Sequence, residues 1–432
     1  MKRLRGIAWM LLLAAGVVAS ATAQIGLPGL PLPKLPDLQD PLAGTLRTTQ
    51  SAPRAELRKL RIRELLRRER DSVEADPDGQ PMLRGQVSAL SPTPAALARA
   101  SEAGFTVLTE EALAGLGLTM VVLRAPRGMS TRRALKRLRE LDPEGSYDYN
   151  HLYLDSGALL DAAETTPPAE SLPAAATPTR TSPVRIGLID SGVDGAHPAL
   201  AGTTIHRFGC AGAALPQAHG TAVASLLVGQ AGDFRGVVPG AVLYAADVFC
   251  GHDGGSIALL SVALDWMARE RVPVVNISLV GAKSVLLTQL VRVMGQRGHL
   301  LVAAVGNDGP SAPPLYPAAY PEVVGVTGVD AKEHVLPEAC RGKHVAYAAP
   351  GADMRAAALG GGWNEVRGTS FAAPIVAGLL AGSLPEADPE RARKALEQLT
   401  AVAVDLGPKG ADTTYGKGLV GAALRVPADT KK

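Results

Sequence analysis

The sequence predicts an α/β fold with a mostly parallel sheet, preceded by a small α+β domain with a ferredoxin-like order of elements. In residues 184–305, apolar runs of strand length alternate with helical stretches, which is typical of a parallel sheet covered by helices. Residues 84–154 are expected to form strand, helix, two strands, helix and strand. Between them, residues 155–183 are rich in Pro, Ala and Thr, which indicates a linker that is open to proteolysis.

Length and composition are those of a folded chain with more than one domain. The chain has 432 residues, of which 47% are hydrophobic, so most of it can bury a core. The formal net charge is only +3, and this gives no reason to expect a nucleic-acid partner.

Residues 1–23 have the composition of a secretory signal peptide. Basic residues at positions 2, 3 and 5 precede an apolar run over 7–18, and Ala21-Thr22-Ala23 follows as a cleavage site. A membrane anchor is the alternative, but the run is shorter than the roughly 20 residues of a spanning helix. We therefore expect export to the periplasm or the extracellular medium, with no membrane span after the signal is removed.

Residues 24–83 combine a Pro-rich arm with a basic helix. Pro and Leu alternate over 27–33, and residues 54–70 hold many Arg and Lys in a helical stretch. The basic helix could bind a membrane surface or a nucleic acid. We prefer a solvated helix in a segment that is later discarded.

Residues 84–154 have the pattern of a compact small domain. Alternation over 85–90 predicts a strand, and apolar residues at helical spacing predict a helix over 93–103. An amphipathic helix capped by Ser130 or Thr131 is expected to end at Leu141. The remaining strands are expected at 105–108, 120–123 and 147–154.

Residues 184–425 are expected to form the large α/β domain, and 426–432 a C-terminal tail. A buried strand over 184–189 leads directly into Asp190. Side chains at the carboxyl ends of parallel strands meet at one edge of the sheet, and Ser278 and Asn307 also lie at or next to such ends. The other elements are expected at 219–230, 257–270 and 284–294 (helices) and at 242–248, 272–279 and 300–305 (strands).

Ser370 has the position of a nucleophile. It follows Gly368 and Thr369 and precedes a small-residue apolar helix over 372–380. Free amides and the positive end of the helix dipole favour negative charge at a helix start, so a serine there lies beside an anion-binding site. The alternative is that Thr369 or Ser370 only caps the helix.

Asp190, His219 and Asn307 supply the other parts of a serine nucleophile's site. A nucleophilic serine needs a base to take its proton and an anion to orient that base, which His219 and Asp190 provide. Asn307 is suited to donate to an oxyanion, and losing such a donor costs about 10²–10³-fold in turnover. Taken singly, Asp190 and Asn307 also suit turns, and His219 suits a helix cap.

Over about residues 184–424, the sequence resembles the subtilase (subtilisin-like) serine peptidases. Four sequence blocks carry this resemblance, and they contain, in this order, Asp190, His219, Asn307 and Ser370. Further blocks that carry the resemblance are Asn276-Ile277-Ser278-Leu279, Tyr316-Pro317-Ala318-Ala319-Tyr320-Pro321, Ala348-Ala349-Pro350-Gly351 and Tyr415-Gly416-Lys417-Gly418-Leu419-Val420. The resemblance implies a subtilisin-like three-layer fold and a serine endopeptidase that acts through an acyl-enzyme.

The resemblance also implies residue roles. Asp190 orients His219, which is base and then acid, and Ser370 attacks the peptide carbonyl. The Ser370 amide and the Asn307 side chain form the oxyanion hole. The implied substrate-binding residues are Ser278, Leu279, Val280, Ala304, Val305, Gly306 and Leu315. Val280, Val305 and Leu315 replace smaller residues usual in the family, which suggests a narrowed apolar pocket.

The resemblance also implies that residues 84–154 form a propeptide domain, which assists folding and occupies the active site until it is cleaved. We expect this self-cleavage within residues 155–183. A permanently attached accessory domain is the alternative. The implied partners are protein or peptide substrates and the chain's own propeptide. The chemistry requires no cofactor; many subtilases bind structural calcium, but the sequence offers no acidic cluster that can be assigned to it.

The family's strand order would place the strand ending near Cys210 beside the strand ending near Cys250. A Cys210–Cys250 disulfide is therefore expected, with Cys340 as a free thiol.

The sequence as a whole is interpreted as a secreted serine endopeptidase made as an autoprocessed precursor. The alternatives are a binding or scaffold protein on the same fold, and a serine hydrolase that acts on esters.

Overall fold

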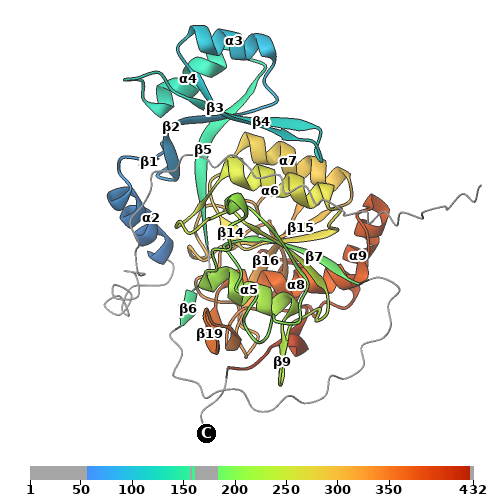
Figure 1. Cartoon of the computed structure of the whole chain (residues 1–432). Helices are drawn as coiled ribbons and strands as arrows, with labels where there is room; N and C mark the ends of the chain where they lie inside the picture. Colours follow the sequence, from blue (N-terminus) through green and yellow to red (C-terminus); the bar gives the residue numbers. More distant parts are fainter. Residues whose placement is uncertain (1–55, 156–157, 161–182, 429–432) are drawn as a thin grey trace, which may run out of the picture.

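The computed structural model describes residues 56–155, 158–160 and 183–428 (Figure 1). The expected signal peptide, the Pro-rich arm and most of the linker lie outside these residues. Within the described part of the chain, no helix is both long and apolar enough to cross a membrane.

The small domain, from α2 to β5, contains an antiparallel sheet with strand order β5-β2-β4-β3. This is the strand-helix-strand-strand-helix-strand arrangement expected for residues 84–154. Strand β2 begins earlier than the strand expected at 85–90, and β1 extends the same sheet. The bounds are α2 Leu57–Arg68, β1 Val73–Ala75, β2 Pro81–Leu90, α3 Pro94–Glu102, β3 Thr106–Leu113, β4 Leu118–Arg124, α4 Thr131–Leu141 and β5 Ser146–Asp155.

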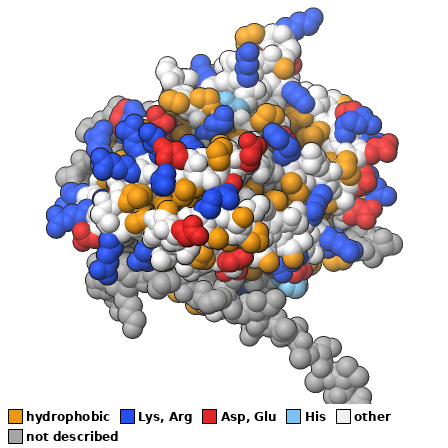
Figure 2. Space-filling model, turned by 90° about the horizontal axis from the view of Figure 1, so that it is seen from above, with side chains coloured by type: hydrophobic (Ala, Val, Ile, Leu, Met, Phe, Trp, Pro, Cys, Tyr) orange, Lys and Arg blue, Asp and Glu red, His pale blue; other side chains and the backbone are white. Residues whose placement is uncertain are grey.

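Helices α3 and α4 cover one face of this sheet because each has one apolar side. Thr93 caps α3, and the hydroxyl of Ser130 caps α4. In α4, Leu135 and Leu138 are buried, while the Arg and Lys between them are exposed. Figure 2 views the molecule from the side of the small domain and shows Lys and Arg side chains spread over this face.

The other face of the small sheet packs on the large domain. Side chains alternate along β4: Val121 and Leu123 belong to the cluster under α3 and α4, whereas Met120 and Val122 belong to a core shared with α6 and α7. The Asp148 carboxylate also accepts a hydrogen bond of 2.9 Å from the backbone N–H of Val285 in the first turn of α7. The two domains are therefore joined by a common core.

The large domain is built on a seven-stranded sheet of order β17-β16-β15-β13-β7-β11-β8. All neighbouring strands are parallel, as the alternation of strands and helices predicted. The bounds are β7 Arg185–Asp190, β8 Ile205–Phe208, β11 Val242–Asp247, β13 Val274–Ile277, β15 Leu300–Ala304, β16 Val323–Val329 and β17 Val345–Pro350.

Helices cover both faces of the large sheet, so the expected three-layer architecture is confirmed (Figure 1). One face packs on α5 Ala218–Val228, α8 Thr369–Ser383 and α9 Pro389–Ala401; the other packs on α6 Ile257–Arg269 and α7 Val285–Gln296. The shorter elements are β6 Ala158–Leu160, β9 Gln230–Ala231, β10 Phe234–Arg235, β12 Gly255–Ser256, β14 Leu279–Val280, β18 Met354–Ala357, β19 Trp363–Arg367 and the 3₁₀ turns Cys210–Gly212 and Ala422–Leu424.

Strand β5 belongs to both domains. It starts in the small sheet and runs down into the large domain (Figure 1). There its last residues pair with β12 on one side and with β14 on the other, both antiparallel. We call the space between β12 and β14, which the end of β5 fills, the cleft.

Candidate active site

Asp190 and His219 form a buried pair at the carboxyl edge of the large sheet. Asp190 is the last residue of β7, and His219 lies in the first turn of α5. Nδ1 of His219 is 2.8 Å from Oδ1 and 3.1 Å from Oδ2 of Asp190. The two side chains are therefore in the contact that their predicted roles require.

The turn after β7 fixes the Asp190 carboxylate. Its Oδ1 accepts hydrogen bonds from the backbone N–H of Ser191 (2.7 Å) and from the Ser191 hydroxyl (3.2 Å). The hydroxyl of Ser191 in turn accepts from the N–H of Gly220, the residue after His219. A Cβ at Gly220 would lie 2.2 Å from the backbone oxygen of Ser191, so only glycine allows this approach.

Burial and charge act in opposite directions on His219. Burial lowers the pKa of its imidazole, but the charge and hydrogen bond of Asp190 outweigh burial, so the pKa is raised. Nε2 of the same ring is buried and has no hydrogen-bond partner among the described residues. This nitrogen has the free lone pair that a general base needs.

Ser370 lies in the first turn of α8, as the sequence indicated, although the helix begins at Thr369 rather than at Ala372. Gly368 precedes the helix with φ of 137°, a value that favours glycine. The Ser370 hydroxyl donates a 3.4 Å hydrogen bond to the backbone oxygen of Ser278, and the Ser278 hydroxyl donates a 3.0 Å bond to the backbone oxygen of Ser370. The ring of Phe371, the next residue, lies 5.5 Å from the ring of His219.

Asn307 is tied to the start of α8. Its side-chain oxygen accepts a 3.1 Å hydrogen bond from the N–H of Thr369, which makes Nδ2 the donor end of this side chain. The Thr369 hydroxyl also accepts a 3.2 Å bond from the N–H of Gly306. These two bonds hold the loop that carries the Asn307 amide against the first turn of α8, which carries Ser370. An oxyanion hole requires such an arrangement.

The expected substrate-binding residues lie in β14 and the residue before it, at the end of β15, and in the loop after β15. Leu279 and Val280 form β14 and pair with Asp155 and Leu154 of β5. Leu315 approaches Gly306 so closely that a Cβ at that glycine would lie 2.5 Å from Cδ1 of the leucine. Leu315 is nearly buried, and the others expected on the pocket wall, Ala304 and Val305, are fully buried.

A contact that the sequence did not reveal joins the basic helix to this site. Arg58 of α2 donates to Asp308, with an N–O distance of 3.2 Å, and both side chains are only 8% exposed. Asp308 is the residue after Asn307. The expectation of a solvated helix over 54–70 is thus wrong for one of its faces. The apolar Ile62 and Leu65 at i, i+3 spacing were the available signal of a buried face.

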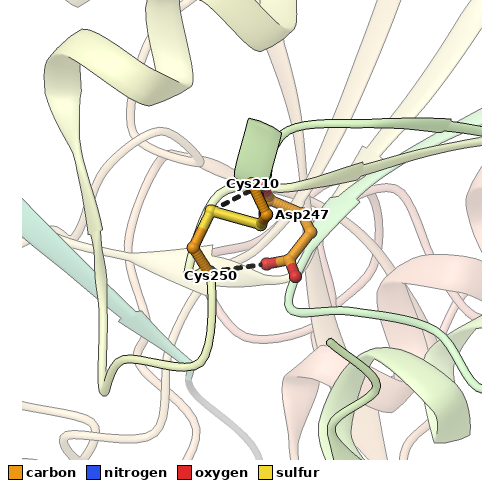
Figure 3. Close-up of side chains that lie close together, drawn as sticks. All are labelled: Cys210, Asp247 and Cys250. Carbon is orange, nitrogen blue, oxygen red and sulfur yellow. Dashed lines mark hydrogen bonds between the residues drawn. A yellow bond between two sulfur atoms is a disulfide. The ribbon is translucent and has the colours of Figure 1, made fainter. Parts of the chain in front are cut away.

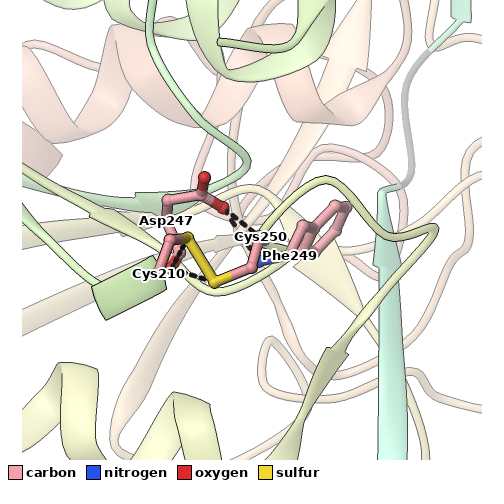
Figure 4. Close-up of a disulfide and its surroundings, with 4 residues drawn as sticks. All are labelled: Cys210, Asp247, Phe249 and Cys250. Carbon is pink, nitrogen blue, oxygen red and sulfur yellow. Dashed lines mark hydrogen bonds between the residues drawn. A yellow bond between two sulfur atoms is a disulfide. The ribbon is translucent and has the colours of Figure 1, made fainter. Parts of the chain in front are cut away.

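The structure has the predicted disulfide between Cys210 and Cys250, with Cα atoms 5.1 Å apart, and leaves Cys340 as a buried free thiol (Figure 4). Strands β8 and β11 are neighbours, as that expectation required. Oδ1 of Asp247 accepts hydrogen bonds of 2.9 Å from the N–H groups of Phe249 and Cys250. The disulfide and this carboxylate together fix the loop after β11.

The cluster of Cys210, Asp247 and Cys250 does not fit a calcium ion (Figure 3). Both sulfur atoms are used in the disulfide, and Asp247 offers a single carboxylate. Calcium takes about 6–8 oxygen ligands. The cluster is therefore a structural one.

Comparison with known proteins agrees with this geometry. The model of the subtilase family matches residues 181–418, which is more than half of the chain. Minor extracellular protease Epr of Bacillus subtilis (strain 168) is 31% identical over 249 residues, covering 55% of this chain and 37% of Epr. Alkaline protease of Alkalihalobacillus alcalophilus is 30% identical over 301 residues, covering 66% of this chain and 77% of that protease.

The solved structure of fervidolysin from Fervidobacterium pennivorans shares the fold. Its TM-score is 0.65 at 21% identity, over 82% of this chain and 62% of fervidolysin. The chain thus spans less than two thirds of the length of both Epr and fervidolysin. The family match and the identity with these proteases lead to one conclusion: the chain belongs to the subtilase family of serine peptidases.

Proposed function

We propose that this protein is a secreted serine endopeptidase, made as a precursor, which hydrolyses peptide bonds with Asp190, His219 and Ser370. The observation that carries the proposal is the convergence of these residues and Asn307, from four separate elements, beside a cleft that already holds an extended strand. The family match supports the same activity.

The geometry supports a two-stage reaction. Ser370 Oγ attacks the peptide carbonyl carbon as its proton passes to Nε2 of His219, and Asp190 holds the opposite side of the ring. The Ser370 N–H and the Asn307 amide stabilise the oxyanion. His219 gives the proton to the departing amine, which leaves an acyl group on Oγ. Water then attacks the ester carbonyl and passes a proton to Nε2 of His219. His219 gives this proton to Oγ of Ser370 as the acyl–oxygen bond breaks, which releases the acid and restores the serine. No step uses a cofactor, and no ligands are assigned to a structural calcium ion.

The strand pairings of the small domain support a role as a propeptide. Strand β5 ends at Asp155 between β12 and β14, and β6 pairs with β19, the strand that leads to Gly368. The chain thus has paired strands on both sides of residues 156–157. This arrangement supports self-cleavage within residues 155–183, with the chain's own propeptide as the first partner and protein or peptide substrates after it.

The sequence and the disulfide support export of the protein from the cytoplasm. The signal-peptide composition of residues 1–23 and the disulfide both suit an oxidising compartment outside the cytoplasm. The relative Epr is named as an extracellular protease. We therefore place the mature protein in the periplasm or the extracellular medium.

The test compares purified wild type with Ser370→Ala in a casein or quenched-peptide assay, with fluorophosphonate labelling of the nucleophile. Loss of the nucleophile is expected to lower turnover by about 10⁶-fold and to abolish labelling. N-terminal sequencing of both secreted proteins tests self-cleavage: the variant is expected to keep its small domain. Correctly folded wild type that neither cleaves peptides nor takes the label would overturn the proposed activity, and identical mature ends would overturn self-cleavage.

A further inference from the structure

Three hydrogen bonds connect Asn276, Ser278 and Ser370. The side-chain amide of Asn276, in β13, donates to the hydroxyl of Ser278 at 2.8 Å. This hydroxyl donates in turn to the backbone oxygen of Ser370 at 3.0 Å, and the Ser370 hydroxyl donates to the backbone oxygen of Ser278 at 3.4 Å. All three residues are 0% exposed. The end of β13 is therefore linked through buried polar groups to the turn that carries the nucleophile.

The sequence of α8 explains why the backbone oxygen of Ser370 takes a donor from outside the helix. In an α-helix, the backbone oxygen of one residue accepts from the N–H four residues later. Four residues after Ser370 stands Pro374, which lies inside the helix and has no N–H. A proline ring also displaces the carbonyl group four residues before it. Because a buried backbone oxygen without a donor is costly, the hydroxyl of Ser278 replaces the missing N–H.

Asn276 determines the direction of the bond from Ser278. A serine hydroxyl has one proton to donate and two lone pairs that accept. The Asn276 amide donates to one of these lone pairs, so the proton of Ser278 remains for the oxygen of Ser370. Oδ1 of Asn276 is buried and has no hydrogen-bond partner among the described residues, which costs stability. A buried amide that is kept at such a cost points to a role beyond packing.

The same bonds connect the nucleophile to the strand that pairs with an extended chain. Ser278 directly precedes β14, whose Leu279 and Val280 pair with the end of β5 in the cleft. The oxygen that Ser278 holds belongs to the peptide group that follows Ser370. Fixing this group limits the movement of Cα and Oγ of Ser370 relative to β14.

We propose that Asn276 and Ser278 are positioning residues, which hold Oγ of Ser370 in place relative to β14 through the backbone oxygen of Ser370, and that Pro374 keeps this oxygen available to Ser278. The proposal rests on the proposed function. It adds that the side chain of Ser278 acts on turnover and not on substrate binding. An extended chain pairs with the backbone of β14, which a change of this side chain leaves in place.

The kinetic test compares kcat and KM of wild type, Ser278→Ala and Ser261→Ala with a peptide substrate. Ser261 is the matched control, because its hydroxyl is also 0% exposed and donates to a backbone oxygen, that of Ile257 in α6, at 2.7 Å. Ser278→Ala is expected to lower kcat at least about tenfold with KM unchanged, since misplacing a reacting group by about 1 Å can cost about 10²-fold. Ser261→Ala is expected to change neither constant.

Two further readouts separate positioning of the nucleophile from a general loss of structure. The rate of fluorophosphonate labelling should fall by the same factor as kcat, because both reactions begin with attack by Ser370. The pH at which kcat/KM falls should not move, because the contact of His219 with Asp190 is left in place. Wild-type kcat in Ser278→Ala, or an equal loss of kcat in Ser261→Ala, would overturn the proposal.

A second variant covers the case in which Ser278→Ala does not fold. Ser278→Cys keeps the side chain close to its original size and offers only a weak S–H donor. It is therefore expected to lower kcat as well, again with KM unchanged. Wild-type kcat in this variant would also count against the positioning role.

A double-mutant cycle in the inactive Ser370→Ala chain tests the role of Pro374 without any activity. Ser370→Ala retains the backbone oxygen at position 370, and Pro374→Ala returns an N–H that can donate to it. The fall in the urea midpoint caused by Ser278→Ala should therefore be smaller with Pro374→Ala than without it. Additive changes would overturn the coupling. Wild type that neither labels nor cleaves peptides would instead reject the peptidase, and this cycle would still decide whether Ser278 replaces the missing N–H.

Discussion

Asp190 contacts His219 through both carboxylate oxygens, and this single contact sets the state of the base. With Nδ1 held by the anion, Nε2 is the nitrogen that can accept a proton. Burial alone would make the imidazole a weak base, and Asp190 more than compensates, so the pKa of His219 is raised above its usual 6.5.

This shift predicts the acid limb of the activity profile. A general base works only when neutral, so kcat/KM should fall as the pH drops through a value above 6.5. Asp190→Asn removes the anion and leaves burial, which should move the inflection to lower pH and reduce kcat by about 10⁴-fold. The measurement is kcat/KM against pH with an uncharged peptide. An unchanged inflection in Asp190→Asn would contradict this assignment of the raised pKa.

The sequence predicts roles for four residues because each lies in a distinct local pattern next to a strand end or a helix start: Asp190, His219, Asn307 and Ser370. It could not identify Arg58. Residues 54–70 contain many basic side chains, and which of them is buried depends on the partner that the helix packs against. That partner, Asp308, is 250 residues away in the chain.

Strand β5 is held in the cleft by its side chains as well as by its backbone. Tyr153 is fully buried, its ring lies over Gly281, where a Cβ would be 2.5 Å from the ring, and its hydroxyl donates a 2.8 Å hydrogen bond to the backbone oxygen of Ala282. This tyrosine anchors the end of the strand.

Replacing the anchor should loosen the cleft-bound strand. Tyr153→Ala removes a buried aromatic ring, a change that costs about 3–5 kcal/mol in protein cores. In the Ser370→Ala chain we expect faster amide exchange over 151–155. Tyr149→Ala, on the same strand but half-buried, is the control and should leave this exchange unchanged. Equal exchange in both variants would show that the backbone pairing alone retains β5.

The Cys210–Cys250 disulfide should stabilise the large domain through the loop that it closes. The two cysteines are 40 residues apart, and closing a loop of that size in the unfolded chain contributes about 4 kcal/mol at most. Changing both residues to Ser should lower the urea midpoint of the Ser370→Ala chain. Cys340→Ala, at a buried free thiol, gives a comparison without loss of a cross-link. A midpoint unaffected by the double change would mean that the cross-link adds no stability.

Long periodic elements could be predicted from the sequence, and short edge strands could not. The helices over 257–269 and 285–296 and the strands of the parallel sheet lie close to their expected positions. By contrast, β6, β12 and β14 have two or three residues each, too few to show a period. They exist because β5 and β19 offer a backbone to pair with, and that depends on how the two domains meet.

The two domains share one apolar core, so we expect them to unfold cooperatively. Side chains of β4 on one face pack with α6 and α7, and those on the other face pack only within the small domain. No local pattern in β4 says which face meets the other domain, since both faces are apolar. The sequence therefore could not predict which face of β4 packs on the large domain, although it did indicate that both faces of β4 are buried.

This division gives a matched pair of variants. Met120 and Leu138 are each 1% exposed, but Met120 faces α6 and α7 and Leu138 faces α3 and β2. Each change to Ala should cost about 2–5 kcal/mol. In the Ser370→Ala chain, Met120→Ala should speed amide exchange in α6 and α7, whereas Leu138→Ala should speed it in α3 and α4. Identical exchange patterns would show that the shared core does not couple the domains.

Because β5 and the cleft that it fills are parts of one chain, they are always synthesised in a one-to-one ratio. The cell makes occupant and cleft in equal number, whatever the level of expression. Before the cut, their encounter is intramolecular, with an effective concentration on the order of millimolar for a short link. If the chain is cut as proposed, the encounter would become an ordinary bimolecular equilibrium, which dilution would shift toward the dissociated large domain. A high local concentration would then keep the large domain occupied and inactive, and dilution into a large volume would be enough to dissociate the small domain.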